Sequence, residues 1–164
     1  QEHFVTFVSF NDVHKTIWNC IPAIEAKEIT DNDYNPNCCT ALYDAMGFSL
    51  NELRPHVADN DKVLVTIVTD GMENASHEYN GIAIKNLIDE LKNKGWVFAY
   101  IGANHDVEKF AAHISITNHF TFQSTMEGTR IMNERSRKSR EHIYRCMSSE
   151  DFDTEEANCN YFKP

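Results

Sequence analysis

The chain has 164 residues, 41% of them hydrophobic and 24% charged, a balance typical of one folded, water-soluble domain. Acidic residues outnumber basic ones by 25 to 15, which gives a net charge of −10. This charge disfavours nucleic acid as a partner and suits cations or basic protein surfaces, or it serves solubility alone. No apolar run has the length of a membrane span, so no membrane partner is predicted.

The first elements predicted in chain order are two short strands. Residues 4–10 form a β-rich run, and residues 16–21 form a second one after the turn chemistry of Asn11-Asp12. Their close spacing predicts an antiparallel hairpin, and Pro22 marks its end or an edge position. The polar residues 25–37 that follow predict a loop.

The pattern then changes to that of helices alternating with strands. A helix over 40–53 is predicted from apolar residues at three- and four-residue steps, and Pro55 ends it. The nearly all-apolar run 63–68 predicts a strand covered on both faces. The elements predicted after it are a helix over 79–94, a strand over 96–101, a helix over 107–113 and a strand over 119–122.

This alternation predicts parallel strands joined by right-handed crossovers. The expected fold class is therefore α/β, a doubly wound and mostly parallel sheet with helices on both faces and an antiparallel hairpin at its edge. A helix over 127–147 closes the expected domain, residues 1–147, although its apolar face is sparse from Ser136 to His142. Residues 148–164 are acidic and lack periodicity, which predicts a poorly packed tail.

Five cysteines occur, at positions 20, 38, 39, 146 and 159. Their number is odd and no Cys-x-x-Cys pair is present, which fits neither a disulfide framework nor the usual spacing of a zinc site. Reduced thiols in the cytoplasm are the preferred interpretation. A redox role for the vicinal pair Cys38-Cys39 is the alternative.

Asp70 ends the apolar run and has two interpretations. In one, Asp70-Gly71 is a turn at the end of a strand and binds nothing. In the other, its carboxylate is a ligand for a hard cation, because open α/β sheets bind ligands beyond the carboxyl ends of their strands. Glu73, Asn74 and Ser76 add oxygen groups nearby, or they cap the helix that follows.

Two segments resemble bacterial von Willebrand factor A domains. They are Thr69-Asp-Gly-Met-Glu-Asn-Ala-Ser76 and Cys39-Thr-Ala-Leu-Tyr-Asp-Ala-Met-Gly47, and their spacing and the surrounding order of strands and helices also match. The likeness covers about residues 3–135. It implies a doubly wound, Rossmann-like α/β fold with a metal-ion-dependent adhesion site that usually holds Mg²⁺, and a role in binding proteins rather than in catalysis.

The resemblance implies two metal ligands in this chain. Thr40 matches the threonine that precedes a helix in the family, and Asp70 matches the aspartate that follows a later strand. The family's remaining ligands come from an Asp-x-Ser-x-Ser loop, which does not occur in these 164 residues. The site in this chain is therefore expected to be incomplete, and Cys38-Cys39 stand where related domains often have Gly and Ser.

In the family, the strand that carries the missing loop lies centrally, between those matching residues 4–10 and 63–68. A chain that opens on Gln1 inside a strand is expected to be a piece of a longer protein that includes it. The alternatives are that a second chain supplies the strand, or that the sheet closes without it.

The function expected is a cytoplasmic protein-binding module, not an enzyme, that uses Mg²⁺ or another divalent cation held by Thr40 and Asp70. An acidic residue of the partner completes the metal shell. The alternatives are a metal-dependent hydrolase, in which Glu73 is the available second carboxylate, and a scaffold with a vestigial site. Asp44, His77 and His105 are secondary candidates, and the ordinary interpretation is a local contact for Asp44 and solvated rings for the histidines.

Overall fold

The computed structural model describes residues 2–30, 33 and 39–163. The chain divides into two compact units, and each is described by itself. Unit 1 comprises Gln1–Asp61 and Glu73–Ile84, and unit 2 comprises Lys62–Met72 and Lys85–Pro164. Six residues of the predicted loop over 25–37, and Cys38 of the vicinal pair, lie outside the described residues.

Unit 1 contains the predicted hairpin. Strands β1 (Phe4–Phe10) and β2 (His14–Pro22) pair antiparallel, and Phe4 lies opposite Pro22. In the tight connection the side-chain Oδ1 of Asn11 accepts a hydrogen bond from the backbone N–H of Val13 at 2.9 Å. The predictions of a hairpin and of a strand end at Pro22 are confirmed, and a short 3-10 turn, η1 (Ala23–Glu25), follows.

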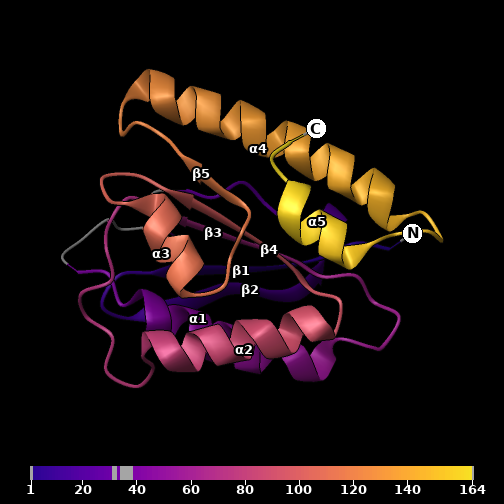
Figure 1. Ribbon diagram of the computed structural model, residues 1–164, viewed down its shortest axis with the longest axis horizontal. Coiled ribbons are helices and arrows are strands. Elements are labelled where there is room, and N and C mark those ends of the chain that lie inside the picture. Colours follow the sequence, from indigo (N-terminus) through magenta and orange to yellow (C-terminus); the bar gives the residue numbers. More distant parts are fainter. Residues whose placement is uncertain (1, 31–32, 34–38, 164) are drawn as a thin grey trace. The chain divides into compact units, whose positions relative to one another are not determined.

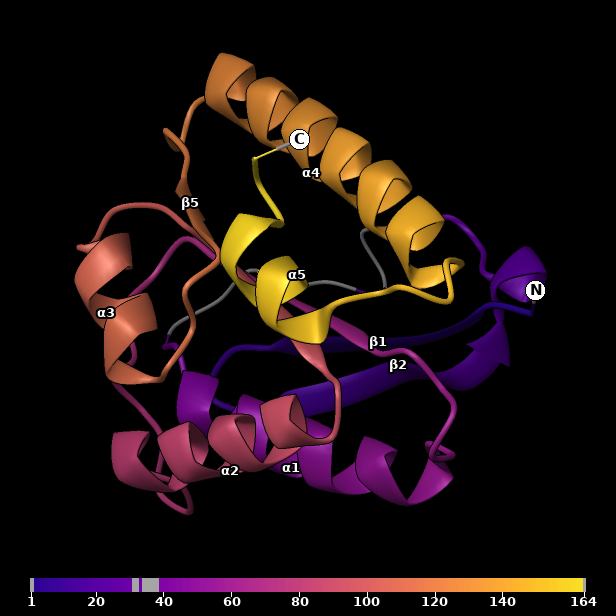
Figure 2. The ribbon, with the colours of Figure 1, turned by 45° about the vertical axis from the view of Figure 1, so that its right-hand side comes forward.

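Helix α1 (Leu42–Leu53) is the other main element of unit 1 and runs along the hairpin (Figure 2). It ends at Leu53 and is followed by the turn η2 (Arg54–His56), which includes Pro55. The helix predicted over 40–53 is confirmed, with its start two residues later. The residues that it buries follow the predicted three- and four-residue steps, and they are Leu42, Ala45, Met46, Gly47 and Leu50.

Unit 2 is built on a parallel sheet of three strands in the order β3-β4-β5. Strand β4 lies in the middle, and all six of its residues are buried, as expected for a strand covered on both faces. The strands are β3 (Leu64–Thr69), β4 (Val97–Gly102) and β5 (His119–Thr121).

Helices cover both faces of this sheet (Figure 1). Alternate residues of β4, from Val97 to Ile101, pack in one cluster with α4 and α5. On the opposite face, the ring of Tyr100 lies 5.3 Å from that of Phe110 in α3. Helix α2 begins in unit 1 and continues into unit 2. The helices are α2 (Gly81–Asn93), α3 (Val107–His113), α4 (Met126–Met147) and α5 (Thr154–Asn160).

Strand β3 differs from the sequence prediction. Among the described residues it pairs with β4 only, so it is an edge strand of this sheet. Val68, near its carboxyl end, is 45% exposed, whereas its neighbour Ile101 on β4 is fully buried. The prediction that this strand is covered on both faces is therefore wrong at its carboxyl end. The fold is α/β, with a helix-flanked parallel sheet and a separate antiparallel hairpin.

The C-terminal segment is packed into unit 2, so the prediction of a poorly packed tail is wrong. Tyr161 and Phe162 are 1% and 5% exposed and join the core cluster. The guanidinium of Arg135 on α4 lies 4.3 Å from the ring centroid of Phe120 and donates to the carbonyl of Phe162 at 3.2 Å. Ser139, a small residue in the part of α4 whose apolar pattern is sparse, is also fully buried.

Two asparagines explain why the tail is held so firmly. The side chain of Asn158 on α5 accepts from the N–H of Phe98 at 3.0 Å and donates to the carbonyl of Trp96 at 2.9 Å. Asn118 donates to the carbonyl of Phe98 at 3.2 Å and accepts from the N–H of Tyr161 at 2.9 Å. These amides satisfy backbone groups of Trp96 and Phe98, which precede the residues of β4 that pair with β5. Buried backbone groups are costly to leave unpaired.

Tyr161 permits a test of this packing. Its hydroxyl lies near Thr66 but has no partner in hydrogen-bonding geometry among the described residues, and burial raises the pKa of Tyr161 to about 12. Because the folded pKa exceeds the unfolded value of about 10, the contribution of this phenol to stability is complete below about pH 10 and is lost as the pH rises toward the folded pKa.

We expect Tyr161→Phe to change the free energy of unfolding at neutral pH by less than about 0.5 kcal/mol, because no hydrogen bond is removed. Near pH 11 the variant should be the more stable protein by about 1 kcal/mol. Urea unfolding across a pH series measures both quantities. Equal losses of stability with pH in the two proteins would contradict this assignment.

Among the residues that the structure describes, no helix has the length and apolar character needed to span a membrane.

Candidate functional site

The two predicted ligands occupy loops at the ends of regular elements. Thr40 precedes α1 and belongs to unit 1, whereas Asp70 follows β3 and belongs to unit 2. Thr40 is half-buried and Asp70 is exposed. The surroundings of each are described within its own unit.

The first turn of α1 is capped by a loop that comes thirty residues later. The N-cap residue, Ala41, offers no side-chain acceptor, although the first N–H groups of a helix need partners. The N–H of Tyr43 donates to Oε2 of Glu73 at 2.9 Å, and the N–H of Asp44 donates to Oγ of Ser76 at 3.0 Å. The loop thus replaces the local cap that the sequence lacks.

Thr40 is fixed by a reciprocal pair of hydrogen bonds with Asn74. Its N–H donates to Oδ1 of Asn74 at 2.9 Å, and its carbonyl accepts from the N–H of Asn74 at 3.0 Å. Its hydroxyl makes no hydrogen bond within the described residues. Thr40 therefore has a fixed backbone and an uncommitted oxygen.

Asp44 is a loop anchor. Its carboxylate accepts from the N–H groups of His77 at 2.8 Å, Glu78 at 3.0 Å and Tyr79 at 2.7 Å. Burial acts to raise the pKa of Asp44, but these three hydrogen bonds outweigh it and hold the pKa below its ordinary value. Asp44 is thus engaged by the backbone of a distant loop, and the expectation of a contact within its own helix is wrong.

Glu73 is equally committed. Its Oε1 accepts from the N–H groups of Ala75 at 3.0 Å and Ser76 at 2.8 Å, and its Oε2 accepts from the hydroxyl of Ser76 at 2.7 Å as well as from Tyr43. Burial, together with the charge of Glu73, raises the pKa of the Tyr43 phenol. The carboxylate of Glu73 therefore holds the loop.

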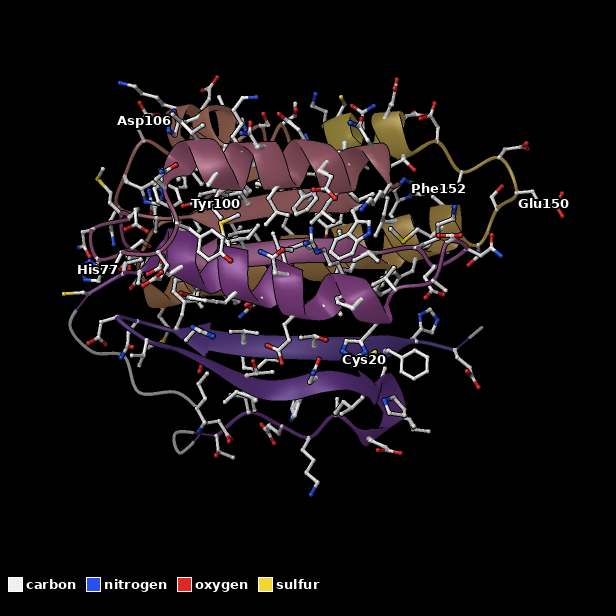
Figure 3. All side chains as sticks on the ribbon, turned by 90° about the horizontal axis from the view of Figure 1, so that it is seen from below. Cys20, His77, Tyr100, Asp106, Glu150 and Phe152 are labelled. Carbon is white, nitrogen blue, oxygen red and sulfur yellow. The ribbon has the colours of Figure 1, made fainter. Side chains whose placement is uncertain are left out.

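Gly47 allows the ring of Tyr79, at the end of this loop, to pack against α1. A Cβ at Gly47 would lie 2.5 Å from ring atoms of Tyr79, closer than side chains approach one another. The Tyr79 hydroxyl accepts from the side chain of Asn51 at 3.1 Å, and Phe48 packs edge-on against the same ring. His77, which is labelled in Figure 3, belongs to the same loop and is exposed.

Asp70 stands at the carboxyl end of β3, where α/β sheets bind ligands. Its carbonyl accepts from Nδ2 of Asn104 at 3.1 Å, and Asn104 has a positive φ of 61° in the turn after β4. The hydroxyl of Thr69 donates a hydrogen bond to the carbonyl of Gly71 and accepts one from the N–H of Gly71. The carboxylate of Asp70 has no hydrogen bond or ion pair within the described residues, although its backbone is held.

His105 is a structural residue. Its Nδ1 donates to the carbonyl of Ala103 at 2.6 Å, and its Nε2 lies 3.0 Å from the hydroxyl of the buried Tyr100. The ring also meets Phe110 edge-on. The expectation of a solvated His105 ring is therefore wrong, because both ring nitrogens have protein partners.

The donors at Thr40 and Asp70 are a hydroxyl and a carboxylate, which are hard oxygen ligands of the kind that Mg²⁺ prefers. Within the described residues no group of three or more His, Cys, Asp or Glu side chains is placed to hold a metal ion. The chemistry of each donor, taken by itself, fits a hard cation.

The role of the loop after Asp70 was missed from the sequence. Glu73, Asn74 and Ser76 cap the preceding helix α1, whereas α2 is capped by Asn80, whose Oδ1 accepts from the N–H of Ala83 at 3.0 Å. The prediction that they cap the following helix is wrong. The available signal was the absence of a side-chain cap at Ala41, which implies that donors at the start of α1 find partners elsewhere.

The fold and these loops define the class of the protein as α/β, with polar residues at the carboxyl end of a parallel strand. No protein-family model, no curated protein and no solved structure matches the chain.

Proposed function

We propose that the chain is a protein-binding module of the von Willebrand factor A type, with the doubly wound α/β fold of that family, in which Thr40 and Asp70 are ligands for a divalent cation. One observation carries the proposal. Asp44, Glu73, Asn74 and Ser76 are committed to holding a loop, whereas the Thr40 hydroxyl and the Asp70 carboxylate lack partners within the described residues. The two oxygens that the resemblance assigns to the cation therefore have no other partner among the described residues.

The chemistry of the two donors favours Mg²⁺. Magnesium keeps several waters and is held through one or two carboxylates, so a threonine, an aspartate and an acidic residue of a protein partner form a reasonable shell. The net charge of −10 also favours a cation. Binding rather than hydrolysis is proposed because Glu73, the second carboxylate that a hydrolase would need, is bonded to four donors.

Isothermal titration with Mg²⁺, after treatment with EDTA, tests the proposal. We expect Asp70→Ala to weaken binding at least about tenfold, equivalent to 1.4 kcal/mol, and Thr40→Ala to weaken it less, because a neutral hydroxyl contributes less than a carboxylate. Asp59→Ala, which removes an exposed aspartate from a turn, should bind as the wild type does.

No Mg²⁺ heat in the wild type, or equal affinities for wild type and Asp70→Ala, would refute the proposed site. Far-ultraviolet circular dichroism and urea unfolding of each variant show that a lost heat is not a lost fold. We also propose that the protein is cytoplasmic, where thiols stay reduced. This proposal is supported by the described cysteines Cys20, Cys39, Cys146 and Cys159, which are free thiols.

A further inference from the structure

The last turns of α4 bring a thiol and an imidazole together. His142 and Cys146 are four residues apart and so lie on the same flank of the helix. Their Sγ and Nε2 atoms are 3.6 Å apart. His142 is exposed and Cys146 is half-buried, so solvent and solutes reach the pair. Helix α4 is the long helix of unit 2 in Figure 1.

The separation of these two atoms matches that of two zinc ligands. With a Zn–S bond of about 2.3 Å, a Zn–N bond of about 2.0 Å and a tetrahedral angle, the ligand atoms S and N lie about 3.5 Å apart. The observed 3.6 Å agrees. Two ligands at i and i+4 on one helix face are also the spacing with which helices chelate zinc. Both side chains can therefore bind one ion without moving apart.

The local charges bear on the binding of a cation. The pair lies near the C-terminal end of α4 (Met126–Met147), the negative end of the helix dipole. Lys138 pairs with Glu134 at 2.8 Å, whereas Nε of Arg145 donates to the neutral carbonyl of Glu141 at 3.1 Å, so Arg145 keeps its positive charge. The helix end therefore favours a positive ion, and the charge of Arg145 opposes it.

We propose that His142 and Cys146 chelate one Zn²⁺ ion, through Nε2 of a neutral imidazole and Sγ of a thiolate. On binding, the thiol releases its proton to the buffer and the Zn–S bond forms, with no change of oxidation state. Water fills the two remaining tetrahedral positions, as befits an exposed site with two protein ligands. This site is independent of the Mg²⁺ ligands proposed above and involves a soft thiolate donor, which Mg²⁺ does not take.

Cobalt(II) is a suitable probe, because it adopts the same geometry as zinc and a Co–thiolate bond gives an intense near-ultraviolet absorption band. We expect the full chain, reduced and freed of metal, to develop this band on addition of Co²⁺ and to lose it when Zn²⁺ is added. Cys146→Ser should abolish the band, and His142→Ala should raise the dissociation constant at least about tenfold.

The matched control is Cys159→Ser, which removes a different thiol of unit 2, an exposed one, and should leave the titration unchanged. Asp70→Ala should also bind Co²⁺ as the wild type does, so failure of this proposal and failure of the Mg²⁺ site are distinguishable. The proposal is overturned if no band develops, if His142→Ala binds with wild-type affinity, or if the band survives Cys146→Ser and disappears when Cys38 and Cys39 are replaced by serine. Circular dichroism of each variant confirms that α4 is retained.

Discussion

Asp44→Ala is expected to lower the free energy of unfolding by about 3 kcal/mol, one of the largest losses for a single polar side chain in this protein. The carboxylate accepts three backbone hydrogen bonds, from His77, Glu78 and Tyr79. Hydrogen bonds to a charged group contribute about 1.5–3 kcal/mol each. The expected loss is smaller than the sum of three such bonds, because water can bond to the exposed N–H groups in the variant. Urea unfolding at neutral pH measures the loss.

Two controls separate this effect from a general one. Asp44→Asn retains one carbonyl oxygen and should lose less than the alanine variant, whereas Asp59→Ala should remain within about 0.5 kcal/mol of the wild type, as surface substitutions usually do. Loss of stability in Asp59→Ala equal to that in Asp44→Ala would contradict the argument.

The pH dependence gives an independent check on Asp44. Because its folded pKa lies below the unfolded value of about 3.9, its contribution to stability is complete above that value and is lost as the pH falls through the folded pKa. The wild type should therefore lose its advantage over Asp44→Ala under acid conditions. An advantage that stays constant down to acid unfolding would show that the charge of Asp44 is not responsible.

Gly128→Ala is expected to destabilise the protein by about 3 kcal/mol, although glycine to alanine inside a helix usually stabilises. A Cβ at Gly128 would lie 2.0 Å from the backbone oxygen of Gln123, and a backbone atom cannot move aside as the end of a side chain can. The gain of up to about 1 kcal/mol from helix propensity is smaller than the cost of this clash.

The control for helix propensity is Asn133→Ala, at an exposed position of the same helix, which should gain about 0.5 kcal/mol. Thermal and urea unfolding of both variants would check the pair. A stability of Gly128→Ala equal to or above that of the wild type would show that the segment at Gln123 shifts freely, in which case the close packing at the start of α4 is not needed for stability.

Local signals predicted much of the fold. The hairpin follows from two β-rich runs with Asn11 between them, and α1 follows from the spacing of residues such as Leu42 and Leu50 and from the stop at Pro55. Strand β4 is covered on both faces, as an uninterrupted apolar run predicts. These elements depend on residues close together in sequence, which is why pattern reasoning finds them.

Other features depend on groups that are distant in sequence. The tail is anchored to β4 and to the core by single side chains, Asn158 and Tyr161. Such contacts leave no periodic pattern in the sequence, so the packing of the tail could not be predicted from it. Val68 is exposed in a strand that, among the described residues, pairs with β4 only. No residue within β3 encodes that edge position. At the candidate site, sequence reasoning identified Thr40 and Asp70, but it could not tell which of the nearby oxygens were already committed to the loop.

The long-range cap of α1 has a consequence for the order of folding. Tyr43 and Glu73 are separated by 30 positions and Asp44 and Tyr79 by 35, so the first turn of α1 cannot be completed by its own neighbours. Closing a loop of this size costs about 3 kcal/mol of chain entropy, which the later contacts must recover. During synthesis α1 leaves the ribosome before its cap exists, and we expect its first turn to become protected from hydrogen exchange only after the loop has docked.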